Sequence, residues 1–202
     1  VNCQVDGLGT ADIHALSLDA VGSTAITIQG TTFSLSGAMF FTMEGRSSLV
    51  FQRNTVAADS VVPVAVELAG SSPVFSVTGE STGMKLFQGN RILKSRIFFR
   101  STSGWLIGGD TPADGNMLVG IRAGIDFENA YDMIVRNNYS HTTIPETGWS
   151  QVKNLAIAGG SGLVIEHNVF WGFNWVVELN GRGELRYNLL IDNIERGWVL
   201  VY

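Results

Sequence analysis

Two short strand-like segments carry acidic residues of the kind that catalyse glycoside hydrolysis. Asp126 and Glu128 lie in "GIDFE", and Glu178 lies in "WVVEL". A pair of carboxylates can act as general acid and general base on a glycosidic bond when both face the substrate, about 6.5–9.5 Å apart in an inverting enzyme. Because the two segments are far apart in the sequence, only the fold can bring these carboxylates together.

A glycine-rich loop and two tryptophans are further candidates for ligand binding. The loop "GGDTPADGN" contains Asp110, Asp114 and Asn116, whose oxygens suit Ca²⁺, but their spacing does not match an EF-hand and most such loops are plain turns. Trp149 and Trp171 could stack on sugar rings if they are exposed, whereas buried aromatic residues fill a core. The sequence otherwise predicts no metal site and no cofactor, because motifs for either are missing.

An asparagine recurs after the same short apolar phrase along the chain. The phrases are "FQRNTV", "FQGNRI", "VRNNYS", "IEHNVF" and "LRYNLL", and their asparagines are Asn54, Asn90, Asn138, Asn168 and Asn188. A second apolar run precedes each phrase, and glycine with small polar residues lies between the two, as in "EGRSS" and "AGGSG". The repeated unit is therefore a strand, a glycine turn, a second strand, an asparagine corner and a variable excursion.

Short strands that recur in this order predict a solenoid, because one coil cannot bury its inner face without its neighbours. At each corner the asparagine can adopt left-handed geometry, and stacked asparagines about 4.8 Å apart can form a hydrogen-bonded ladder. We predict an all-β, right-handed parallel β-helix of about seven or eight coils over residues 36–202, with residues 1–35 forming the first coils or a cap. Residues 10–20 could instead form a short helix.

The strand–turn–strand–asparagine phrases resemble the right-handed parallel β-helix, or pectin-lyase-like, superfamily. The two "FQxN" phrases also resemble the FxxN repeats of polymorphic outer-membrane adhesins and of large protozoan surface β-helix proteins, although the companion GGA-type motif is missing. The resemblance implies an architecture in which ligands meet the outer face of a stacked strand column. It also implies an extracellular or cell-surface location.

Stacked coils would align the candidate carboxylates. One outward position of the first strands gives Thr42, Ser76, Asp126, Ala156 and Glu178, and the next gives Glu44, Thr78, Glu128, Ala158 and Asn180. Asp126 and Glu178 would then lie two coils apart, about 9–10 Å, near the upper limit for an inverting glycosidase. The simpler interpretation is that these are solvated carboxylates on an acidic protein. Arg122 is the nearby cation that a lyase would need.

The outward column of the second strands predicts a salt-bridge ladder. Its members are Gln52, Gln88, Arg136, Glu166 and Arg186. The last three alternate in charge, which favours pairing between neighbouring coils over binding of a charged ligand.

Composition narrows the classes of partner. The net charge is −5, from 13 basic and 18 acidic residues without a basic cluster, so we expect no nucleic-acid binding. No apolar run reaches the ~18 residues that a membrane span needs. The single cysteine, Cys3, cannot form an internal disulfide, although it could link to another chain.

Two functions remain open from the sequence. The first is a non-enzymatic extracellular or cell-surface module that is structural, adhesive or self-assembling, with filaments formed through open terminal coils. The strand "GWVLVY" lacks a polar cap, so we expect the helix to continue past it or to be covered by a partner. The alternative is a carbohydrate-active enzyme, either a glycoside hydrolase or a polysaccharide lyase, acting on a polysaccharide.

Overall fold

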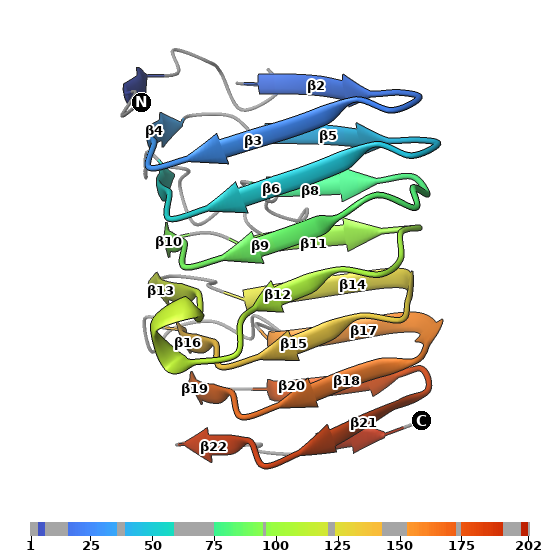
Figure 1. Cartoon of the computed structure of the whole chain (residues 1–202). Helices are drawn as coiled ribbons and strands as arrows, with labels where there is room; N and C mark the ends of the chain where they lie inside the picture. Colours follow the sequence, from blue (N-terminus) through green and yellow to red (C-terminus); the bar gives the residue numbers. More distant parts are fainter. Residues whose placement is uncertain are drawn as a thin grey trace, which may run out of the picture.

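The computed structural model is a right-handed parallel β-helix (Figure 1). It describes residues 4–6, 16–35, 39–58, 75–94, 96–120, 124–142, 153–172, 175–191 and 199–201. Each coil contributes one strand to each of three parallel sheets, which we call the first, second and third sheets in the order of the predicted repeat, with the sheet that follows the asparagine corner as the third. In the described residues these sheets contain eight, seven and eight strands. The predicted all-β solenoid is therefore confirmed.

The first sheet contains β2 (Leu16–Ala20), β5 (Met39–Met43), β8 (Phe75–Thr78), β11 (Arg96–Arg100), β14 (Gly124–Tyr131), β17 (Lys153–Ser161), β20 (Trp175–Asn180) and β23 (Val199–Val201). The second sheet contains β3 (Ala25–Gln29), β6 (Ser48–Gln52), β9 (Lys85–Gln88), β12 (Leu106–Gly108), β15 (Ile134–Arg136), β18 (Leu163–Glu166) and β21 (Gly183–Arg186). The third sheet contains β1 (Gln4–Asp6), β4 (Thr32–Leu35), β7 (Thr55–Ala58), β10 (Arg91–Leu93), β13 (Met117–Gly120), β16 (Tyr139–Thr142), β19 (Val169–Gly172) and β22 (Leu189–Ile191). A single turn of 3₁₀ helix, η2, covers Pro112–Asp114.

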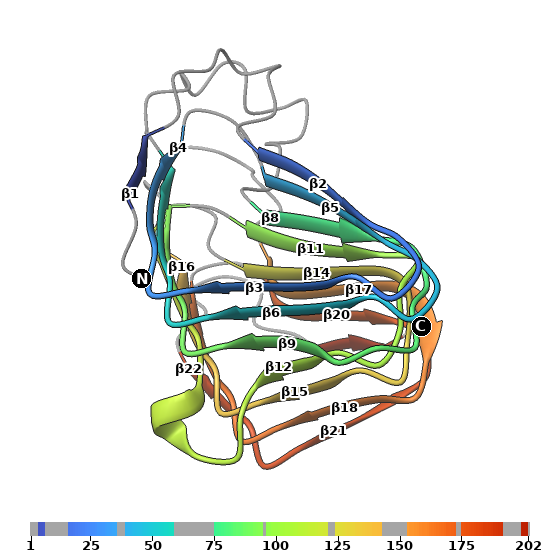
Figure 2. The same cartoon turned by 45° about the horizontal axis from the view of Figure 1, so that its top comes forward.

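The structure adds elements to the predicted repeat. A short third strand begins directly after each asparagine corner, where the sequence predicted a variable excursion (Figure 2). β11 and β12 form a further coil that the asparagine phrases did not reveal. The helix predicted for residues 10–20 is wrong over Leu16–Ala20, which forms β2, and the rest of that segment lies outside the described residues.

Alternation along each strand sends every second side chain into the core. In β18, Leu163 and Ile165 are buried while their neighbours face outward, as the pattern predicted. Aromatic rings stack from coil to coil inside the helix: the rings of Phe51 and Phe87 are 5.3 Å apart and nearly parallel. Neighbouring coils therefore share one continuous hydrophobic core.

The asparagines form the predicted ladder at the corner between the second and third sheets. From Asn54 to Asn168, the backbone N–H and Nδ2 of each donate to Oδ1 of the asparagine on the next coil, at 2.8–3.2 Å. Nδ2 also donates to a carbonyl on the preceding coil, which for Asn138 is that of Ile107. Each buried amide is thus satisfied only when three coils are stacked in register.

One detail of the corner differs from the prediction. The left-handed backbone belongs to the residue before the asparagine, for example Arg53, His167 and Tyr187, with φ between 54° and 55°. That bend turns the chain, and the following asparagine then points inward to the ladder. Because the asparagine itself does not have a positive φ, it is needed for its amide rather than for its backbone freedom.

Asn116 is a sixth member of the ladder that the phrase did not identify. It accepts from Asn90 and donates to Asn138, and it is 1% exposed. Residues 109–115 form an excursion that separates Asn116 from Ile107, the inward residue that normally lies three positions before the asparagine. Gly108 permits this departure, because a Cβ there would lie 1.9 Å from the carbonyl oxygen of Arg136.

Lys85 occupies a core position. It pairs in register with the buried Leu49, it is 5% exposed, and its Nζ donates to the carbonyl oxygen of Ser81. Desolvation by burial lowers the pKa of this ammonium from its ordinary 10.5, against an opposing contribution from Glu80. A charged lysine at this position therefore opposes folding.

We expect Asn138→Ala to destabilise the protein by about 2–4 kcal/mol, because two donors of Asn116 and the carbonyl of Ile107 lose their buried partner. Chemical denaturation followed by circular dichroism measures this. The matched control is Asn180→Ala on an exposed position, which should change stability by less than about 0.5 kcal/mol. Equal effects of the two changes would contradict a stabilising role for the ladder.

We expect Lys85→Met to raise the free energy of unfolding at neutral pH by about 1–3 kcal/mol. The lowered pKa means that the unfolded chain binds more protons than the folded one as pH approaches 10.5, so wild-type stability should rise with pH in that window. The Lys85→Met variant should lack this contribution to the rise of stability with pH. Denaturation curves at several alkaline pH values test both points, and a destabilised variant would contradict them.

Candidate functional site

The structure places the predicted carboxylate positions in one column of the first sheet. Asp126 pairs in register with Ala156, and Ala156 pairs with Glu178. With one strand between them and about 4.8 Å per strand, Asp126 and Glu178 are about 10 Å apart along the column. The backbone alignment predicted for these three residues is therefore confirmed, while the side chain of Glu178 lies outside the described set.

The predicted alignment is wrong for the column members that precede Asp126 and Glu128 in the chain. β11 inserts Phe98 between Ser76 and Asp126, and it inserts Arg100 between Thr78 and Glu128. Thr42 pairs with Thr78 and so belongs to the second outward column. Glu44, which was assigned to that column, follows the end of β5. The sequence alignment failed because it counted back from the last apolar residue of β5. That residue lies two positions beyond the one that is in register with the other strands.

Two arginines on β11 bind the candidate carboxylates. Arg96 forms a two-pronged ion pair with Asp126 through Nε and Nη2. Arg100 donates to Oε2 of Glu128 from Nε at 3.0 Å and from Nη2 at 2.8 Å. The sequence could have indicated these cations through the alternation in "RIFFR", whereas the predicted cation, Arg122, lies outside the described residues.

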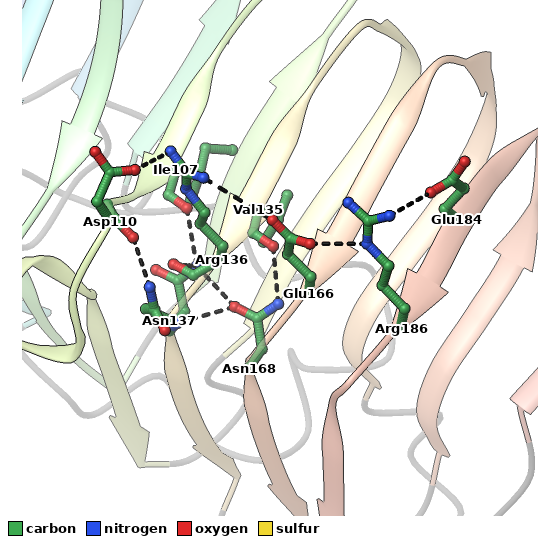
Figure 3. Close-up of polar contacts among 11 residues, drawn as sticks. Ile107, Asp110, Val135, Arg136, Asn137, Glu166, Asn168, Glu184 and Arg186 are labelled. Atoms are coloured by element: carbon green, nitrogen blue, oxygen red, sulfur yellow. Dashed lines mark hydrogen bonds and ion pairs between the residues drawn. The ribbon is translucent and has the colours of Figure 1, made fainter.

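The predicted salt-bridge ladder is present on the second sheet (Figure 3). Glu166 accepts from Nε of Arg186 at 2.8 Å, and one of its oxygens lies 3.9 Å from Nη1 of Arg136. Arg136 also binds Asp110, and Arg186 lies 3.2 Å from Glu184. The hydrogen bond that Arg186 donates to Glu166 raises the pKa of its guanidinium. Together with Asp110 of the excursion, the charges of alternating sign in this column thus tie four successive coils together.

The predicted Ca²⁺ ligands of the glycine-rich loop bind other groups of the protein. Asp110 binds Arg136, and Asp114 accepts from the hydroxyl of Thr111 at 2.8 Å. Oδ1 of Asn116 accepts two hydrogen bonds within the buried ladder. In the described part of the chain, no group of three His, Cys, Asp or Glu residues is arranged to hold a metal ion. The loop therefore does not fit Ca²⁺ as arranged.

Trp171 lies on the outer side of the third sheet. Its ring stacks on His141 of the neighbouring strand, with centroids 4.2 Å apart and planes 12° apart, and the residue is partly buried. One face of the indole is therefore covered by the imidazole. The second predicted sugar contact, Trp149, lies outside the described residues.

Two surface hollows lie away from the candidate carboxylates. The larger, of about 340 Å³, is lined by Asp19, Ala20, Val21, Thr42 and Glu44 at the ends of β2 and β5. The smaller, of about 60 Å³, lies beside β21. Neither is lined by Asp126 or Glu128.

Comparisons with protein-family models, with curated proteins and with solved structures give no match to this chain. Its assignment to a parallel β-helix therefore depends on the geometry described above. Among the described residues, no helix has the length and apolar character needed to cross a membrane.

We expect the Arg96–Asp126 pair to be coupled more strongly than the Arg100–Glu128 pair. The side chains of the first pair are 12% and 24% exposed, against 53% and 37% for the second, so solvent screens the second pair more. Double-mutant cycles with Arg→Gln, Asp126→Asn and Glu128→Gln should give about 1–3 kcal/mol for the first pair and below about 1 kcal/mol for the second. Equal coupling energies would contradict this ordering.

Proposed function

We propose that this chain is a non-enzymatic β-helix module of an extracellular or cell-surface protein, with a structural, adhesive or self-assembling role. The supporting observation is the use that the described coils make of their outward charges. Asp126 and Glu128, the best candidates for catalysis, are both bound by arginines of the adjacent coil. Charges arranged in this way hold neighbouring coils in register.

Catalysis makes demands that this arrangement meets poorly. A general acid or base needs an oxygen within hydrogen-bond reach of the substrate, about 2.6–3.2 Å. Both oxygens of Asp126 already accept from Arg96. The larger of the two hollows described above lies on β2 and β5, several coils from β14. The small share of charged residues, 15%, and the resemblance of the FxxN phrases to repeats of surface proteins support the same proposal.

A carbohydrate-active enzyme of the pectin-lyase-like superfamily is the second candidate. It is favoured by one specific observation, the alignment of Asp126 and Glu178 about 10 Å apart with only Ala156 between them. Fold analogy adds little, because one fold supports many functions.

A depolymerisation screen separates the two functions. Neutral and uronate-containing polysaccharides would be incubated with the wild-type chain and with Asp126→Asn and Glu178→Gln variants, and new reducing ends and unsaturated products would be measured. We expect no activity above that of heat-denatured protein. Activity in the wild type that falls by at least about 100-fold in either variant would replace our proposal with the enzymatic one.

A further inference from the structure

The outer face of the second sheet carries an uninterrupted column of aliphatic residues. One outward position on five successive strands, β6 to β18, gives Val50, Leu86, Leu106, Ile134 and Val164. All five are partly exposed, and Ile134 leaves 38% of its surface open. Met84, at the edge of the same face, is 66% exposed. A continuous apolar surface of this kind is typical of a face that another molecule covers.

The polar column beside it changes character at the middle of the sheet. On one half it holds Gln29, Gln52 and Gln88, and on the other half it holds Arg136, Glu166 and Arg186. Gly108 of β12 lies between the two halves. β12 is the fourth of the seven strands, so the face is divided into an uncharged half and a charged half of equal length.

We infer that this face docks a second copy of the same chain, related by a two-fold axis that runs along β12. Such an axis places β9 opposite β15 and β6 opposite β18. Leu106 then meets Leu106 of the second copy. In the same way Leu86 meets Ile134, and Val50 meets Val164. The aliphatic column is centred on Leu106, so it covers its own copy along its full length.

The same axis places each charged side chain of the polar column opposite a glutamine of the second copy. Gln88 faces Arg136, Gln52 faces Glu166, and Gln29 faces Arg186, so no two like charges meet in this column. An amide side chain both donates and accepts, and it can therefore bind either a guanidinium or a carboxylate. The excursion at residues 109–115 begins at the end of β12 (Figure 2).

A charged partner would fit this face less well than a second copy. Glu166 already pairs with Arg186, and Arg136 already pairs with Asp110. A partner of either sign would have to compete with these contacts, whereas the glutamines of a second copy leave them in place. Sheets that pack face to face lie about 10 Å apart, which suits interdigitated Leu, Ile and Val side chains.

The size of the face predicts a weak dimer. Seven strands about 4.8 Å apart give a length of about 29 Å, and strands of three to five residues give a width of about 10–16 Å. The contact is therefore about 300–450 Å² per partner, smaller than the ~800 Å² per partner of a standard specific interface. We expect a monomer–dimer equilibrium that is populated only at high protein concentration. This dimer would deepen the proposed structural role and rests on it.

Charge-swap variants at the axis test the dimer. Leu106→Lys places two like charges against each other, as does Leu106→Glu, so each variant alone should dimerise at least about tenfold more weakly than wild type in sedimentation equilibrium. An equimolar mixture of the two should restore association, because lysine then meets glutamate. Leu86→Lys mixed with Ile134→Glu should also associate, which identifies the antiparallel axis. Thr78→Lys, on the exposed outer side of the first sheet, is the matched control and should leave the equilibrium unchanged.

Circular dichroism and thermal unfolding confirm that each variant is folded before it is compared. A wild-type protein that stays monomeric at the highest soluble concentration overturns the inference, and so does a charge-swap mixture that fails to associate. Binding of this face to a different partner, blocked by Leu106→Lys while the wild type remains monomeric, also overturns it. These results are independent of the polysaccharide screen, since a folded monomer without enzymatic activity would contradict the dimer and leave the proposed structural role standing.

Discussion

The hydrogen bond between a buried asparagine amide and the asparagine of the next coil is the interaction on which this architecture depends. Oδ1 of Asn90 accepts both the backbone N–H and the Nδ2 of Asn54, and its own Nδ2 reaches the carbonyl of Phe51. A shift of one residue in any coil would leave these groups buried without partners, which costs more than the bonds themselves contribute. The ladder therefore fixes the register of every strand that enters or leaves the corner.

Register at the corner determines what lies on every outer face. Because the strands are parallel and aligned, equivalent positions form straight columns on each outer face. The second sheet has an aliphatic column beside a polar one, and the first sheet has arginine on β11 next to carboxylate on β14. Ion pairs such as Arg96–Asp126 are a consequence of this alignment, and they reinforce it. Function, whether structural or catalytic, has to be built from such columns.

The stack tolerates departures from the repeat both in the core and at the corner. Lys85 replaces an apolar residue in an inward column, and its ammonium is satisfied by the nearby carbonyl of Ser81. The chain also inserts the excursion at 109–115 without disturbing the ladder, since Asn116 returns to the same corner and binds both neighbours. Loops can be lengthened between fixed corners because their ends, and not their lengths, determine how the coils stack.

The sequence by itself determined the repeat. Alternating apolar residues, glycine turns and five recurring asparagines are local patterns, and they specified strands, corners and the ladder without knowledge of distant contacts. The tertiary structure decided which residues contact one another across neighbouring coils. The partners of Asp126 and Glu128 lie on a coil whose asparagine is displaced by the excursion. The recurring asparagine phrase therefore did not identify that coil or its two arginines. Alternation in "KLFQ" places Lys85 on the same face as Phe87, but only the coils above and below bury that position, because burial depends on contacts that are distant in the sequence.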